Sequence, residues 1–480
     1  MTTTRTALAL SFLDRYSGLV IHTASSMVIA RLLTPSEIGI YSVAMILLGF
    51  IATFRDLGTV QYLIQNKSLT TEKMRANWSV QLGLGLFFAA LVLVMATPVA
   101  RFYGEPEMVD IMLVLALNCA ITPFSAYPYA CLVREMRLGP IAAMRFVSAL
   151  GHAGAAIGLA WYGFGPVSLA WGNAVATVAG IVTIWLVARP RLPWRPIMHG
   201  IGDVVSFGGK LAVTSLMEAL SGGAPELLLG KLQGMVAAGL FSRGQGLVIM
   251  FQRLVMDAVN TVALPYFARQ SREARDISSP FLVAMELITG LGWAFFSCIA
   301  LLAYPAIRIL YGVQWDDAVD PARWLAVACA FAIPGAICSQ PLIGIGAVND
   351  VLKATLLSML ATLIAVTIGA LLDLLQLSQC LIVAGLLSSV FWLHAARKHI
   401  HFSTRAILRV WGKSLLVALG SSAASVAVIF HWGWRPSELL LPLLISGIGG
   451  ALGALLMAWA SGHQLWQELR SVYLARSARR

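Results

Sequence analysis

The feature that most constrains this chain is a series of apolar runs, each close to the length that crosses a lipid bilayer. A helix needs about 20 predominantly apolar residues to span the hydrocarbon of a membrane. Runs of that size lie at 10–31, 38–57, 79–100, 110–130, 143–163, 166–188, 204–229, 238–264, 280–304, 323–345, 352–373, 378–395, 412–431 and 438–460. They predict an all-α integral membrane protein with about fourteen transmembrane helices.

The composition leads to the same class. Of the 480 residues, 59% are hydrophobic and only 12% are charged, whereas a soluble globular chain is about 25% charged. The net charge of +12 does not indicate a nucleic-acid partner, because the basic residues form no patch with interleaved aromatic residues. They lie instead in short clusters between the apolar runs, as is typical of membrane topology signals.

The distribution of lysine and arginine predicts the orientation. Cytoplasmic loops carry an excess of these residues. With the N-terminus inside, 25 of the 34 lie on the cytoplasmic side, six on the opposite side and three within helices. We therefore expect a multi-pass protein of an inner (cytoplasmic) membrane with both termini in the cytoplasm.

Several classes of function find no motif in the sequence. The chain has no P-loop, no G-x-S-x-G and no metal-ligand spacing, and its six cysteines are scattered through apolar runs without a C-x-x-C pair. The first apolar run is interrupted by Asp14 and Arg15, which favours a retained helix over a cleaved signal peptide. Every loop is short, so no soluble domain is expected. We predict no enzyme, no cofactor and no metal site.

One internal repeat stands out at an offset of 200 residues. Arg31-Leu32 is followed after six residues by Gly39-Ile40-Tyr41-Ser42, and Lys231-Leu232 is followed after six by Gly239-Leu240-Phe241-Ser242. Six helices separate the copies, which predicts a parallel repeat about an axis along the membrane normal. The expected organisation is an N-terminal six-helix lobe at 1–190, a C-terminal six-helix lobe at 191–400, and two extra helices with a basic cytoplasmic tail at 401–480. A chance similarity between two apolar hairpins is the alternative.

Polar and charged residues inside the predicted spans gather on the first, second, seventh and eighth helices, which the repeat makes equivalent. A charged side chain at the centre of a span costs about 2.5–3.5 kcal/mol on insertion scales, so it usually faces a cavity or a partner. The candidates for a water-filled, cationic cavity between the lobes are Arg15, His22, Arg55, Lys210, Arg243 and Arg253. The candidates for ion coupling are Asp14, Asp56, Glu218 and Asp257. For each residue singly, the alternative is structural pairing, as between Arg253 and Asp257 four positions apart.

A cationic cavity suits a ligand that carries phosphate groups, because arginine and lysine bind phosphate through charge-assisted hydrogen bonds. The acidic pair after Trp315, Asp316 and Asp317, is similar to the acidic pairs of membrane glycosyltransferases. It stands alone in a short loop, however, where a solvated turn is the simpler interpretation.

Three stretches carry a resemblance to a known family. They are residues 30–41 (ARLLTPSEIGIY), 54–58 (FRDLG) and 63–65 (LIQ), joined further along by Leu310-Tyr311-Gly312 with Gln314-Trp315. The chain resembles the polysaccharide transporter family, the Wzx-type oligosaccharide flippases of the multidrug/oligosaccharidyl-lipid/polysaccharide exporter superfamily. The likeness is specific in the first 65 residues and diffuse over the remainder.

The resemblance implies alternating access, with an undecaprenyl-diphosphate oligosaccharide flipped from the inner to the outer leaflet for exopolysaccharide, capsule or O-antigen biosynthesis. Related flippases carry cationic residues on the first, second, seventh and eighth helices. The implied partners are the lipid-linked oligosaccharide, membrane lipid, and a polysaccharide polymerase with chain-length or export proteins. A cation-coupled multidrug exporter of the same superfamily is the alternative, and a membrane polymerase or glycosyltransferase is a remote one.

Overall fold

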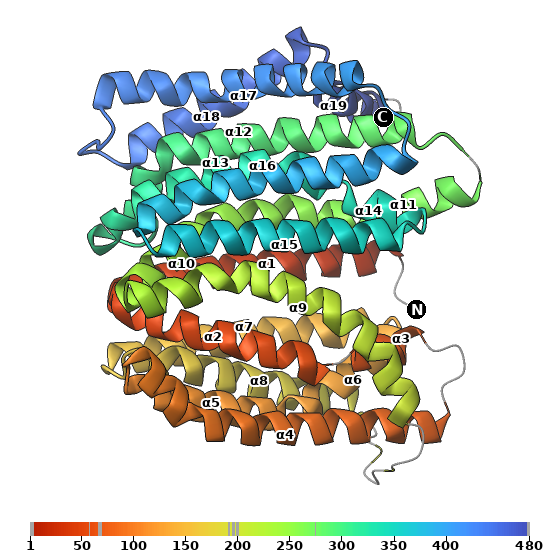
Figure 1. The fold of residues 1–480 in the computed structure, drawn as a ribbon, viewed down its shortest axis with the longest axis vertical. Coiled ribbons are helices and arrows are strands. Elements are labelled where there is room, and N and C mark those ends of the chain that lie inside the picture. The colour runs from red at the N-terminus through yellow and green to blue at the C-terminus, as the bar shows by residue number, and fades with distance from the viewer. Residues whose placement is uncertain are drawn as a thin grey trace. The chain divides into compact units, whose positions relative to one another are not determined.

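The structure is a computed structural model that describes residues 4–56, 58–65, 70–190, 193, 197, 201–273 and 275–477. The side chains of residues 4–16, 65, 203–214, 472–473 and 475–477 lie outside this description. Every regular element in the described ranges is a helix, and no strand is found among them (Figure 1). The predicted all-α class is confirmed.

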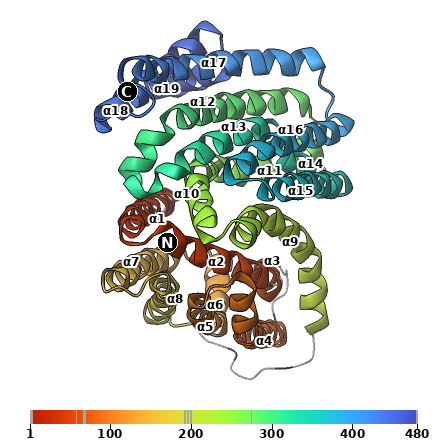
Figure 2. The ribbon, with the colours of Figure 1, turned by 60° about the vertical axis from the view of Figure 1, so that its left-hand side comes forward.

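Contacts divide the chain into two compact units, Met1–Gly239 and Leu240–Arg480. The first unit contains α1 (Thr4–Leu32), α2 (Pro35–Asp56), α3 (Thr59–Gln65), α4 (Thr71–Tyr103), α5 (Glu107–Ile121), α6 (Pro123–Arg134), α7 (Leu138–Trp161), α8 (Val167–Ala188), α9 (Ile201–Leu232) and the start of α10 (Met235–Phe251). Within it α1 packs on α7, α7 on α8, α4 on α5, and α2 on α9 (Figure 2). Because α9 also contacts α3 and α4, it belongs to this unit.

Local sequence sets where these helices begin and end. The hydroxyl of Thr70 accepts the amide N–H of Lys73 and caps the start of α4. At the other end Gly104 takes a left-handed conformation, φ 79°, which glycine adopts without strain. Pro123 opens α6 and bends it by 44° from α5, so the predicted span 110–130 consists of two helices.

The second unit contains the rest of α10, the π-helical segment η1 (Gln252–Met256), α11 (Asp257–Arg272), α12 (Ser278–Leu310), the 3-10 turn η2 (Val313–Ala318), α13 (Val319–Ala336), α14 (Ser339–Gly344), α15 (Val348–Ala370), α16 (Leu374–His399), α17 (Thr404–Trp432), α18 (Leu440–Ala460) and α19 (Gln464–Ser477). α12 contacts α13, α17, α18 and α19. It is therefore the central helix of this unit, and the C-terminal helices pack directly on it.

The outer surface of the helices is suited to lipid. On α18 the exposed side chains include Leu444, Ile448, Leu452 and Leu456, four residues apart and hence on one face. Eleven described helices are long and apolar enough to cross a membrane, or twelve if α5 and α6 form one bent span. The chain is a multi-pass membrane protein.

The predicted total of fourteen spans stays a prediction. The two further spans, 10–31 and 204–229, run over residues whose side chains lie outside the description. The predicted lobes 1–190, 191–400 and 401–480 also stay predictions.

The helix boundaries follow the predicted repeat. α1 ends at Leu32 and α2 begins at Pro35, while α9 ends at Leu232 and α10 begins at Met235. Both connections therefore have the same length and lie 200 residues apart. This agreement favours a true repeat over a chance similarity.

Candidate functional site

The ten residues predicted for the cavity and for ion coupling lie on α1, α2, α9 and α10 and on the segments η1 and α11 that continue α10. The side chains of Asp14, Arg15 and Lys210 lie outside the described part of the structure. The other seven are described, and they fall into a paired group and an exposed group.

Arg55 belongs to the paired group. It lies in the last turn of α2, and its side chain is 13% exposed. Its Nε donates to Asp56 Oδ1 at 2.9 Å, and its Nη1 approaches the Sγ of Cys119 on α5 at 3.7 Å. The carboxylate of Asp56 is itself 59% exposed. The structure thus brings the predicted Arg55 and Asp56 together, so that much of the cost of burying the Arg55 charge is offset by its neighbour.

Arg243 is also held by neighbouring side chains. Its guanidinium carbon lies 5.4 Å from the ring centre of Tyr311 and 5.5 Å from that of Trp315, within the range of a cation–π interaction. Both rings are buried. Because they lie at the end of α12 and in η2, they fix the Arg243 side chain at one end of the second unit.

The surroundings of Trp315 also test the interpretation of this segment as a solvated turn. Trp315 is fully buried, and Asp316 Oδ1 lies 3.6 Å from Arg308 Nε. Only Asp317 of the acidic pair is exposed. The interpretation as a solvated turn is therefore wrong for Trp315, whose large apolar ring favours burial. The acidic pair is split between an ion pair and solvent rather than aimed at a common site.

Arg253 and Asp257 form the exposed group in the second unit. Arg253 lies in η1, where the chain leaves the α-helical hydrogen-bond pattern, and Asp257 begins α11. Both are exposed, and Gln252 Nε2 donates to Asp257 Oδ1 at 3.4 Å. Single π-helical turns inside α-helices occur frequently at functional sites. Arg253 lies in such a turn, within a segment apolar enough to span the membrane. Because its side chain is exposed, a ligand can reach its charge.

His22 and Glu218 are exposed in the first unit. His22 lies on α1 and Glu218 on α9. A charged carboxylate turned toward lipid would cost several kcal/mol, about 2.5–3.5 on insertion scales for an acid at mid-helix. The exposure of Glu218 therefore favours a water-filled surface on this side of α9.

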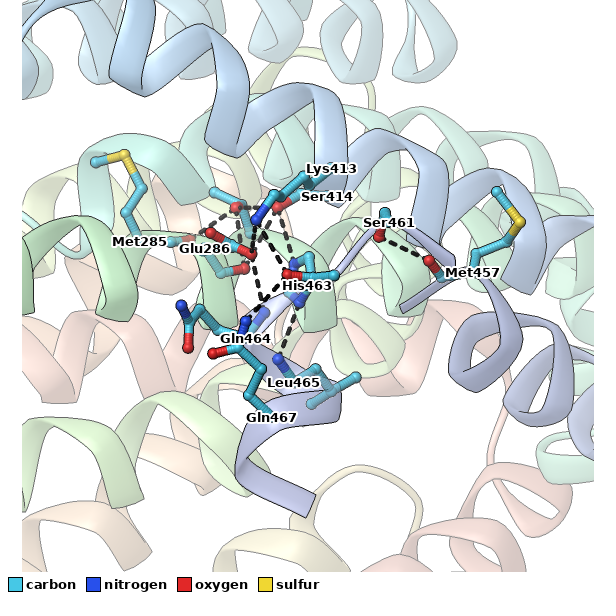
Figure 3. Close-up of polar contacts among 12 residues, drawn as sticks. Met285, Glu286, Lys413, Ser414, Met457, Ser461, His463, Gln464, Leu465 and Gln467 are labelled. Carbon is cyan, nitrogen blue, oxygen red and sulfur yellow. Dashed lines mark hydrogen bonds and ion pairs between the residues drawn. The ribbon is translucent and has the colours of Figure 1, made fainter. Parts of the chain in front are cut away.

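Sequence reasoning missed one buried ionisable cluster in the second unit, formed by Glu286 on α12, Lys413 and Ser414 on α17, and His463 between α18 and α19 (Figure 3). We call these four residues the Glu286 cluster. Lys413 Nζ donates to Glu286 Oε1 at 3.4 Å and to the Gly462 carbonyl at 3.0 Å. The same Glu286 oxygen accepts the first amide N–H of α19, from Gln464, at 2.9 Å. The carboxylate thus neutralises a lysine and caps a helix whose N-terminal end is partly positive.

His463 completes the cluster through both ring nitrogens. Its Nδ1 accepts the amide N–H of Leu465 at 3.1 Å, so in the neutral ring the proton is on Nε2. Nε2 lies 3.3 Å from Ser414 Oγ and can donate to it. His463 lies outside the membrane-spanning segments, and burial lowers its pKa, an effect that Lys413 adds to and Glu286 opposes.

One signal in the sequence could have revealed the cluster. Glu286 lies inside the predicted span 280–304, where a carboxylate needs a partner, and Lys413 opens the predicted span 412–431. A lysine at the boundary of a span is usually a topology signal, however, and so does not by itself indicate a partner for Glu286. Nothing in the spacing of these residues predicts that the turn after α18 returns to α12.

The geometry defines the class first: an all-helical, multi-pass membrane protein with charged side chains inside its spans. The particular family follows from comparison. A family model described as "Polysaccharide biosynthesis protein" matches residues 28–320, and the chain belongs to this family. The resemblance to the polysaccharide transporters is confirmed.

Three similar proteins bear on fold and function. Succinoglycan biosynthesis transport protein ExoT of Rhizobium meliloti (strain 1021) is 24% identical over 72% of this chain and 69% of its own length. The structure of lipid II flippase MurJ in an inward closed conformation is 12% identical, with a TM-score of 0.77 over 96% of this chain and 99% of its own. An inward-facing multidrug resistance MATE family transporter of the MOP superfamily is 17% identical, with a TM-score of 0.63 over 79% and 94%. The fold is thus shared with transporters and flippases.

Proposed function

We propose that this protein flips lipid-linked oligosaccharides, carried on undecaprenyl diphosphate, from the inner to the outer leaflet of the bacterial cytoplasmic membrane. The observation that carries the proposal is the combination of membership in a polysaccharide biosynthesis family with a MurJ-like fold over nearly the whole chain. A flippase of this kind supplies glycan units to exopolysaccharide, capsule or O-antigen synthesis. A polysaccharide polymerase and chain-length or export proteins are then the partners at the outer face.

The cationic residues of α1, α2, α9 and α10–η1 supply the chemistry for a diphosphate headgroup. Arg15, Arg55, Lys210, Arg243 and Arg253 are the candidates, with Asp14, Asp56, Glu218 and Asp257 as candidate ion-coupling groups. Among those whose side chains are described, Arg253 is the most exposed to a ligand, whereas Arg55 and Arg243 are partly buried. We infer that Arg253 makes the most direct contact with phosphate in the transport cycle.

Flipping in proteoliposomes tests the proposal. The substrate is an undecaprenyl-diphosphate oligosaccharide labelled on its sugar, and its appearance on the far side is followed with protein present and absent. Arg15→Ala, Lys210→Ala and Arg253→Ala are expected to lower the rate, while Arg409→Ala, an exposed residue of α17, serves as the matched control. A second outcome would contradict the proposal: the protein flips no lipid-linked glycan but transports small cations.

That second outcome would favour the multidrug alternative, for which the MATE-like fold is the supporting observation. The mildly basic set of intramembrane residues argues against it, since export of cations favours an acidic path.

We also propose that both termini are cytoplasmic. Reaction of single cysteines at residues 2 and 478 with an impermeant thiol reagent, in intact and in opened cells, tests this topology.

A further inference from the structure

The two copies of the repeat meet at a pair of glycines in the first unit. α2 and α10 begin at Pro35 and Met235, and each carries a glycine four residues further on. A Cβ placed on Gly39 would lie 1.9 Å from the carbonyl oxygen of Met235, and one placed on Gly239 would lie 1.9 Å from that of Pro35. Carbon and oxygen that are not bonded approach to about 3.3 Å at closest in such contacts. Only glycine therefore allows these two helix backbones to cross.

The crossing is reciprocal. The contact of Gly39 with Met235 becomes the contact of Gly239 with Pro35 when the two positions are exchanged through the offset of 200 residues. A contact in which i meets j and j meets i is the signature of a twofold axis. The contact between Pro35–Gly39 and Met235–Gly239 is thus symmetric under exchange of the two copies of the repeat.

Within the first unit, the end of α9 is joined to the end of α4. Lys231 Nζ donates to the carbonyl of Phe102 at the end of α4 and lies 4.2 Å from its ring centre. Tyr103 Oη donates to the carbonyl of Leu227 at 3.4 Å. Both contacts are hydrogen bonds to backbone carbonyls, and they join α9 to α4 a few residues before α10 begins.

The crossing itself is different in kind. The atoms nearest to the two glycines are backbone carbonyl and amide atoms, and contacts of Cα–H groups with carbonyl oxygens are individually weak. Such a contact separates at little cost, yet it closes only if neither position carries a side chain.

We propose that the crossing of Gly39 and Gly239 is a seal that closes the outer side of the transport path and separates when the substrate leaves. The assignment to the outer side follows from the proposed topology, and the role in transport rests on the proposed function. The seal has one discrete closed geometry, set by two backbones in contact, which suits a protein that alternates between two states.

Ser42 supplies a probe of the closed state. It lies three residues after Gly39 on α2, and its Oγ is buried without a hydrogen-bond partner among the described residues. A cysteine at this position, in a variant whose six native cysteines are replaced, should react slowly with an impermeant thiol reagent while the seal is closed.

The first experiment measures the labelling rate of Ser42→Cys in four backgrounds: unchanged, Gly39→Ala, Gly239→Ala and the control Gly49→Ala. Gly49 also lies on α2, but its Cβ would meet nothing within 4 Å. Either alanine at the crossing should raise the labelling rate to the same extent, because the two positions are equivalent, while Gly49→Ala should leave it unchanged. Flipping should fall about tenfold or more in both crossing variants, because a seal that cannot close depletes one of the two states between which the protein alternates.

A crossing variant that labels and flips like the unchanged protein would overturn the proposal. Gel filtration before each assay separates a folded open variant from a misfolded one. If both crossing variants misfold, the Ser42→Cys variant with both glycines intact tests the proposal. Its reaction with the thiol reagent should be faster while substrate is being flipped, and an unchanged rate would again overturn the proposal. Altered labelling together with no flipping of any glycan in the unchanged protein would support the seal and contradict the proposed function.

Discussion

Two charged regions of the second unit differ in how far solvent reaches them. In the Glu286 cluster the carboxylate accepts two hydrogen bonds, from Lys413 and from the first amide of α19, and the imidazole of His463 is bonded through both nitrogens. Arg253, in contrast, is exposed in a π-helical turn of a membrane-spanning segment. A buried and saturated cluster stabilises the fold, whereas an exposed cation within a span is available to a ligand.

The largest expected effect on stability comes from breaking the Glu286 cluster. Glu286→Ala leaves Lys413 without its carboxylate and α19 without its cap, and removing one partner of a buried ion pair costs about 3–5 kcal/mol. Thermal unfolding of the purified protein should show a clearly lower Tm. Glu468→Ala, an exposed glutamate on α19, should leave the Tm nearly unchanged, and equal effects of the two substitutions would remove the distinction drawn here.

The opposite pattern is expected at Arg253. Arg253→Ala should change stability by less than about 0.5 kcal/mol, as exposed substitutions usually do, but should lower flipping by a factor of ten or more, because a hydrogen bond to a charged group contributes about 1.5–3 kcal/mol. Arg253→Lys should restore part of the rate, since lysine keeps the charge without the planar two-pronged geometry. A large fall in Tm with normal flipping per folded molecule would show that Arg253 is structural.

The sequence predicted the helical class, the approximate spans and the repeat because these depend on local patterns. Apolar runs near 20 residues and an offset of 200 between Gly39 and Gly239 can be read without any knowledge of packing. The family followed from short stretches around Arg31 and Arg55. The break of α5 at Pro123 was not predicted, although a proline at the first turn of a helix is a familiar boundary signal.

The site was less predictable, because the role of a charged residue depends on neighbours distant in sequence. Arg55 is paired with the adjacent Asp56, but its approach to Cys119 crosses 64 positions. Glu286 meets residues 127 and 178 positions away. A rule that treats every intramembrane charge as a cavity candidate therefore finds Arg253 and misses that Lys413 is a structural partner.

A smaller effect is expected from crowding the Glu286 cluster rather than from removing a charge. A Cβ on Gly290 would lie 2.5 Å from His463 Nε2, so Gly290→Ala should displace the imidazole and destabilise the protein by about 1–3 kcal/mol, as overpacking typically does. Gly412→Ala is the matched control. Gly412 directly precedes Lys413 on α17, and a Cβ placed on it would meet nothing within 4 Å. The control should be neutral or stabilising by up to about 1 kcal/mol, because alanine favours helix over glycine. A Tm that moves equally in both variants would show that helix propensity, not the fit of His463, controls the result.

The smallest effect is the pH dependence of the Glu286 cluster. The pKa of His463 is lowered by burial and by Lys413, so the unfolded chain binds a proton at higher pH than the folded protein does. The stabilisation is then complete above the ordinary histidine pKa of about 6.5 and is lost as the pH falls from there through the folded-state pKa, at up to about 1.4 kcal/mol per pH unit. Protonation of Nδ1 would also end its bond from the Leu465 amide.

His463→Asn keeps an acceptor for that amide but cannot titrate, so its Tm should vary less between about pH 7 and pH 5 than that of the unchanged protein. Identical pH profiles would place the acid sensitivity elsewhere and leave the Glu286 cluster as a pH-independent contact between α12, α17 and α19.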